Sequence, residues 1–99
     1  MAAGLILQFP ASVTESDYDA VNEKLPFDAR SDDTTWPRGL LSHAAGPSDE
    51  GWLVFEIWES KDAQATFMEN DLGPALGAVG LPDPTRVTWF DVVNERHPG

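Results

Sequence analysis

The order of the apolar segments is the feature that most constrains the fold of this chain. Four short apolar runs have the length and composition of β-strands: residues 5–9, 39–45, 52–58 and 86–93. Amphipathic segments follow the first and the third of them. The order strand, helix, strand, strand, helix, strand is that of the split βαβ arrangement. It predicts an α+β, ferredoxin-like fold, in which a four-stranded antiparallel sheet carries both helices on one face.

The first helix has a recognisable start in the sequence. Thr14 is a suitable N-cap, and Asp17 stands at the third helical position, where it can complete a capping box. Asn22 and the acidic residues are expected on the polar faces of this helix. The expected apolar stripe comprises Tyr18, Val21 and Leu25.

Turn and cap signals divide the rest of the chain. The stretch 46–51 predicts a hairpin loop, and residues 27–37, with Trp36, predict a long polar connection. Ser60 is expected to cap the second helix. Pro74 predicts a kink or break in that helix, and Gly80 is its expected C-terminal glycine.

Length and charge exclude several classes of protein. A chain of 99 residues forms a single domain over 1–99, with a polar tail at 94–99. The formal net charge of −11 argues against binding to nucleic acid and to acidic membrane surfaces. The sequence has no cysteine, and residues 1–10 lack the basic start of a signal peptide. We therefore expect a cytoplasmic protein.

The third strand alternates between two kinds of face. Because Leu53, Phe55 and Ile57 are uniformly apolar, they are expected to pack beneath the helices. The other face would then be open. Leaving its two indoles in water would forfeit roughly 2 kcal/mol each, so we expect a second copy of the chain to cover them. The residues of this mixed face are Trp52, Val54, Glu56 and Trp58.

Pairing of the second and third strands brings a histidine to this face. A symmetric hairpin places His43 opposite Val54, on the side of Glu56 and Trp58, whereas a slip of one residue would reverse it. Gln8 is the polar candidate on the first strand. On the last strand, the pocket face holds either Trp89 with Asp91 or Thr88 with Phe90, and the sequence leaves both open.

Residues 51–63, Gly-Trp-Leu-Val-Phe-Glu-Ile-Trp-Glu-Ser-Lys-Asp-Ala, followed by Phe67, resemble the dimeric α/β-barrel superfamily. More narrowly, they are similar to small proteins of the antibiotic-biosynthesis-monooxygenase-like (ABM-like) group. The resemblance implies a homodimer with a small apolar pocket in each protomer, either between sheet and helices or within the barrel. It also implies that Trp58 lines the pocket, and that Val54 replaces a common pocket asparagine. Haem-degrading members carry a histidine where this chain has Phe67, which argues against haem degradation.

These observations give two candidate functions. The first is an ABM-like homodimer that binds a small apolar or aromatic molecule and acts as a cofactor-independent monooxygenase. His43 would then be the general base, since histidine accepts protons near neutral pH. The alternative is a non-catalytic dimer that binds or senses such a ligand, with His43 as an ordinary hydrogen-bonded side chain. We expect neither a cofactor nor a metal. The candidate ligand-binding residues are Trp58, Trp52, Glu56, Gln8, Phe67 and Val54.

Overall fold

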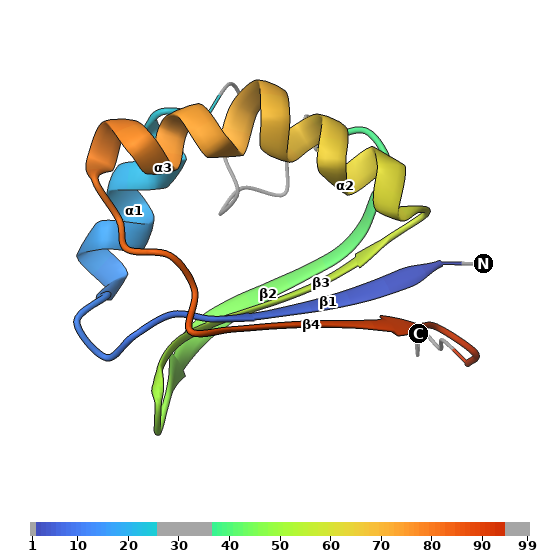
Figure 1. Ribbon diagram of the computed structural model, residues 1–99, viewed down its shortest axis with the longest axis horizontal. Coiled ribbons are helices and arrows are strands. Elements are labelled where there is room, and N and C mark those ends of the chain that lie inside the picture. The colour runs from blue at the N-terminus through green and yellow to red at the C-terminus, as the bar shows by residue number, and fades with distance from the viewer. Residues whose placement is uncertain (1, 26–36, 95–99) are drawn as a thin grey trace, which may run out of the picture.

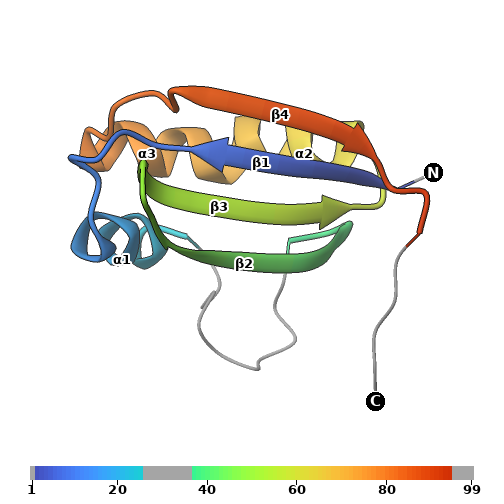
Figure 2. The same ribbon diagram turned by 90° about the horizontal axis from the view of Figure 1, so that it is seen from below.

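The computed structural model describes residues 2–25 and 37–94 and confirms the predicted α+β, ferredoxin-like architecture. One antiparallel sheet has the strand order β2-β3-β1-β4 (Figure 2), and the helices cover one of its faces (Figure 1). The predicted connection at 27–37, apart from its last residue, lies outside the described residues, as does nearly all of the tail. The elements are β1 (Ala3–Gln8), α1 (Glu15–Glu23), β2 (Leu40–Ser48), β3 (Gly51–Trp58), α2 (Lys61–Phe67), η1 (Met68–Leu72), α3 (Gly73–Val79) and β4 (Arg86–Asp91).

The predicted capping box at the start of α1 is confirmed. The Asp17 backbone N–H donates to Thr14 Oγ1 at 3.3 Å, and the Thr14 N–H donates to Asp17 Oδ2 at 2.9 Å. These two bonds satisfy backbone donors that the first helical turn leaves unpaired. They also fix where the helix begins, and so which of its side chains face the sheet.

The hairpin between β2 and β3 is tighter than the sequence predicts. Ser48 pairs with Gly51, so the turn has two residues rather than six, and the predicted loop at 46–51 is wrong. Pro47 lies within β2, which tolerates a residue without an N–H because it is an edge strand. As a result His43 pairs with Glu56 instead of Val54. The register differs from the prediction by two residues, so His43 keeps the predicted face.

The strand β2 also contains an irregularity close to His43. The register shifts between Leu40, which pairs with Trp58, and Ser42, which pairs with Ile57. The intervening Leu41 is half exposed. An extra residue of this kind is a β-bulge, which changes the alternation of side chains along one strand.

The second helical region continues through Pro74 instead of ending there. The segments α2, η1 and α3 follow one another without a gap (Figure 1). The disturbance that proline causes takes the form of the π-helical segment η1, which ends as the Gly73 N–H bonds to the Met68 carbonyl. A methyl group on Gly73 would lie 2.7 Å from that carbonyl oxygen, so the wide turn requires glycine. Gly80 ends α3 in the left-handed conformation, as predicted.

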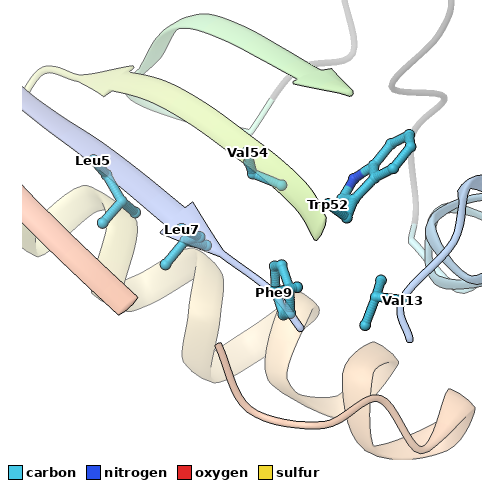
Figure 3. Close-up of a cluster of buried hydrophobic side chains, with 6 residues drawn as sticks. All are labelled: Leu5, Leu7, Phe9, Val13, Trp52 and Val54. Carbon is cyan, nitrogen blue, oxygen red and sulfur yellow. The ribbon is translucent and has the colours of Figure 1, made fainter. Parts of the chain in front are cut away.

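The tryptophan face of β3 lies beneath the helices, so the predicted orientation of this strand is wrong. Trp58 is fully buried and packs against Phe67 of α2, with ring centroids 5.5 Å apart. Trp52 packs against Tyr18 of α1 at 5.1 Å. Trp52 also belongs to the main buried cluster (Figure 3), which comprises Leu5, Leu7, Phe9, Val13, Trp52 and Val54.

None of the described helices covers the opposite face of the sheet, and that face is largely apolar. Figure 2 looks directly onto this face. Ile6 pairs with Phe55 at its centre, and both are partly buried, while Phe90 on β4 is 39% exposed and lies over Gly4. Thr88 and Phe90 therefore face away from the helices, whereas Trp89 packs against the buried cluster. A single chain thus leaves an apolar surface, but not the one predicted.

Candidate functional site

A pocket lies between the sheet and the helices, with a cavity volume of about 70 Å³. Its wall is mostly aliphatic and aromatic, with side chains from β1, β2, β3, α1 and the α2–α3 region. Leu25 and Pro37 also line it. A lining of this kind favours an apolar ligand. The polar side chains in its lining are Tyr18, Asn22, His43 and Glu56.

Three of these polar side chains form a continuous hydrogen-bonded relay. The Tyr18 hydroxyl lies 2.7 Å from His43 Nε2, and His43 Nδ1 lies 3.1 Å from Glu56 Oε2. A carboxylate only accepts, so His43 Nδ1 carries the proton and donates it to Glu56. His43 Nε2 is then an acceptor, and Tyr18 donates to it. Tyr18, His43 and Glu56 are thus linked in the order of a general-base relay.

Glu56 is buried, and both of its carboxylate oxygens have donors. The residue is 4% exposed, and the Trp58 Nε1–H donates to Oε1 at 3.0 Å. Since His43 occupies Oε2, each oxygen accepts one N–H. These bonds offset the cost of placing a carboxylate in the interior. They also hold the carboxylate in the orientation that fixes the His43 tautomer.

Three elements of the fold position this relay. The β2–β3 register sets His43 directly beside Glu56. The capping box of α1 sets the helical phase that turns Tyr18 toward the sheet, where its ring stacks on His43 at 6.3 Å between centroids. The relay therefore joins an edge strand, an inner strand and a helix. In this order it can take a proton from a bound molecule and stabilise the resulting imidazolium with Glu56.

The structure brings most of the candidate residues to one place. Gln8 and Trp58 are outside the pocket lining. The Gln8 amide donates to the backbone carbonyls of Phe9 and Trp52, and its oxygen accepts from Ser48. Trp58 lies behind the lining and holds Glu56. The candidate residues in the lining itself are His43, Trp52, Val54, Glu56 and Phe67.

Two residues of α1 enter the site that sequence reasoning did not select. Tyr18 was expected only as part of an apolar stripe, and Asn22 was expected on a polar face, which is wrong because it lines the pocket. The spacing of four residues between them was the available signal, since positions i and i+4 share a helix face. Tyr18 was not selected because it stands in an otherwise apolar stripe, and Asn22 was not selected because it was assigned to the polar face.

Metal ligands do not gather in the part of the chain that the structure describes. Within residues 2–25 and 37–94, no three His, Cys, Asp or Glu side chains are close enough together to hold an ion. Across these ranges, no helix is both long and apolar enough to cross a membrane.

Comparison with known proteins gives similarity at the level of structure. No family model and no curated protein matches the sequence. A solved structure from Chloroflexus aurantiacus, described as an antibiotic biosynthesis monooxygenase, matches with a TM-score of 0.69 at 12% identity, covering 100% of both chains. Rv0793 from Mycobacterium tuberculosis matches with a TM-score of 0.67 at 20% identity, covering 98% of this chain and all of its own.

A third solved structure has a bound ligand. It is a monooxygenase from the ActVA-Orf6 gene of Streptomyces coelicolor in complex with nanaomycin D. Its TM-score is 0.57 at 18% identity, covering 99% of this chain and 92% of its own. These identities are low, while the coverage is nearly complete. The chain therefore has the ABM-like form of the α+β ferredoxin fold.

Proposed function

We propose that this protein binds a small apolar or aromatic molecule in the pocket between sheet and helices and removes a proton from it. The observation that carries the proposal is the Tyr18–His43–Glu56 relay in the lining of an otherwise apolar pocket. A pocket that served only to bind an apolar ligand would gain nothing from a buried carboxylate and imidazole. A general base uses both, since the imidazole takes up the proton and the carboxylate stabilises the resulting charge.

The proton follows a defined path in this proposal. Tyr18 Oη accepts the proton of the bound molecule while its own proton moves to His43 Nε2. The products are a ligand anion and an imidazolium that Glu56 stabilises. General-base catalysis by such a group contributes about 10²–10⁴-fold to a rate.

Cofactor-independent monooxygenation is the reaction we propose for the anion. A phenol and O₂ give a quinone and water: the ring carbon gains one oxygen atom, the other leaves in water, and the electrons come from the phenol itself. The fold similarity to a monooxygenase that binds nanaomycin D supports this class of reaction. Phe67 stands at the position where a histidine would be expected for haem degradation. The second candidate function is binding or sensing of the same molecule without turnover.

We also propose that the protein is a homodimer. The support is the uncovered apolar face centred on Ile6, Phe55 and Phe90, which would lose water contact if two sheets faced each other. This face is distinct from the pocket face. A dimer would therefore cover the face of the sheet opposite the helices, and it would not be needed to cover Trp52 or Trp58.

Oxygen consumption tests the catalytic proposal. We expect the wild type to consume O₂ with 1-naphthol or 1,8-dihydroxyanthrone, and we expect Tyr18→Phe and His43→Ala to lose about 10²–10⁴-fold of that rate. Ser42→Ala, on the neighbouring position of β2, is the matched control and should keep full activity. Equal ligand binding by the wild type and both relay variants, without turnover in any of them, would favour the sensing function.

Light scattering tests the dimer. At micromolar protein and moderate salt, which screens the repulsion between chains of charge −11, we expect the mass of two chains. Phe55→Asp, on the uncovered face, should give a folded monomer. A wild-type monomer under these conditions contradicts the dimer but leaves the pocket and its relay unaffected.

A further inference from the structure

The Tyr18–His43 end of the relay borders two spaces. Tyr18, His43 and Trp52 line the pocket between sheet and helices, and the same three residues line a surface groove of about 350 Å³. This outer groove lies between the start of α1 and β2, which Figure 2 shows at the edge of the sheet; its other lining residues are Glu15 and residues 44–47. The relay residues therefore stand in a wall that the pocket and the outer groove share.

Short side chains on β2 form one side of the outer groove. They belong to Ala44, Ala45, Gly46 and Pro47. A methyl group added to Gly46 would have no neighbouring atom within 4 Å, and Ala45 is exposed. Because β2 is an edge strand, no other described strand lies beside these residues. The described residues therefore leave the outer groove open to solvent.

The Glu56 end of the relay is poorly placed to release a proton. Both Glu56 oxygens accept an N–H, from His43 and from Trp58, so a proton on this carboxylate would displace a hydrogen bond. Glu56 lines the pocket but not the outer groove. The side chain of His43 is 14% exposed, against 6% for that of Glu56. The relay is therefore more open to solvent at the Tyr18–His43 end.

A base in this position must lose its proton before it can act again. After the proposed proton removal, both nitrogens of His43 carry a proton, and Tyr18 Oη carries the proton that came from the ligand. A bound ligand occupies the pocket side of these two residues. The proton must then either return to the ligand anion, which undoes the step, or leave on the side of the outer groove.

Resting on the proposed function, we propose that the outer groove is where the relay releases its proton to solvent while the ligand stays in the pocket. The Tyr18 Oη–H bond breaks as a water molecule of the groove takes the proton, and the His43 Nε2–H proton moves to Oη. The products are a hydronium ion and the neutral Tyr18–His43 pair. Glu15 stands three residues before Tyr18 on the same side of α1, and its carboxylate favours the departure of a positive charge through the groove.

Hydrogen exchange of a bound ligand in the absence of O₂ tests this route. In D₂O, we expect the wild type to form the coloured anion of 1,8-dihydroxyanthrone in stopped flow, and to exchange the C10 protons of this compound for deuterium, as measured by mass spectrometry. Anion formation reports ligand entry and proton removal, which take place within the pocket. Exchange additionally requires that the relay release its proton to solvent.

Filling the outer groove should slow the exchange alone. Ala45 lies two residues after His43 on the same face of β2, and Ala45→Val and Ala45→Phe introduce larger residues that strands favour. We expect exchange to slow progressively, by about tenfold in Ala45→Phe, which is less than the 10²–10⁴-fold that a general base contributes. Anion formation should keep its wild-type rate. Ala65→Phe, the same change at an exposed position of α2 outside both spaces, should keep both rates.

The outcomes separate this inference from the proposed function. Equal exchange by the wild type and both Ala45 variants overturns the exit route and leaves the proposed function intact. Equal slowing of anion formation and exchange also overturns the exit route, because the groove would then admit the ligand or the substitution would have displaced His43. If the wild type forms no anion and catalyses no exchange, the proposed function is overturned as well.

Discussion

Replacing Glu56 by glutamine removes one of the two acceptors on which the relay depends. The carboxylate accepts the Trp58 Nε1–H at 3.0 Å and the His43 Nδ1–H at 3.1 Å, whereas an amide retains a single oxygen. A hydrogen bond to a charged group contributes about 1.5–3 kcal/mol, and one to a neutral group about 0.5–1.5 kcal/mol. In the glutamine variant the amide oxygen accepts from Trp58 and the amide nitrogen donates to His43, so two hydrogen bonds to a charged group become two neutral ones. This predicts a loss of about 2–3 kcal/mol in the free energy of unfolding for Glu56→Gln.

Urea and thermal unfolding measure this loss. For a domain of about 100 residues, the melting temperature falls by roughly 4–8 °C per kcal/mol, so we expect a decrease of roughly 10–20 °C. Glu59→Gln is the matched control, because it makes the same chemical change at an exposed residue just after β3. That variant should stay within about 0.5 kcal/mol of the wild type.

The same variant should reverse the direction of the relay. In the wild type, His43 Nδ1 carries the proton and Nε2 accepts from Tyr18. An amide nitrogen opposite Nδ1 favours the other tautomer, in which Nε2–H donates to Tyr18. The ¹⁵N shifts of the two His43 ring nitrogens distinguish the two tautomers. An unchanged tautomer, together with equal stabilities of Glu56→Gln and Glu59→Gln, would refute the relay.

The glycines supply two further predictions. Gly4→Ala should cost about 1–3 kcal/mol because the Phe90 ring occupies the space of the new methyl group, whereas Gly46→Ala, with open space around it, should be close to neutral in the same urea titration. Gly73→Ala should destabilise the π-helical turn by crowding the Met68 carbonyl, and Gly77→Ala, exposed within α3, should instead stabilise by about 0.5–1 kcal/mol. Equal melting temperatures of Gly4→Ala and Gly46→Ala would contradict the backbone geometry described for β1. Equal melting temperatures of Gly73→Ala and Gly77→Ala would contradict the geometry described for η1.

The architecture could be predicted from the sequence because its signals are local. The Thr14–Asp17 capping box, the Ser60 cap and the left-handed Gly80 each depend on a few neighbouring residues, and all three are present. The order of the elements then leaves few ways to form one sheet. The hairpin turn was misplaced because Gly46 and Pro47 have turn composition, and only the edge position of β2 explains why they continue a strand.

The orientation of β3 could not be predicted because both of its faces are apolar. Glu56 made one face look suited to water. The carboxylate can be buried because His43, on the neighbouring strand, and Trp58, on the same strand, supply donors to it. The parity of His43 with Glu56 was nevertheless correct, since a register error of two residues preserves the face. The prediction that His43 and Glu56 share a face was therefore correct although the predicted orientation of β3 was wrong. Tyr18 and Asn22 could not be selected, because their positions depend on how α1 packs on the sheet, which the sequence does not specify.

The bulge at Leu41 lets β2 serve two requirements that a regular strand would set against each other. Leu40 and His43 are three positions apart, so strict alternation would send their side chains to opposite sides, yet both line the pocket. With the extra residue between them, the stretch before Leu41 can follow the shape of the cavity wall while the stretch after it stays aligned with Glu56. If Leu41 were deleted, Leu40 and His43 would point to opposite sides of the sheet, so only one of them could line the pocket.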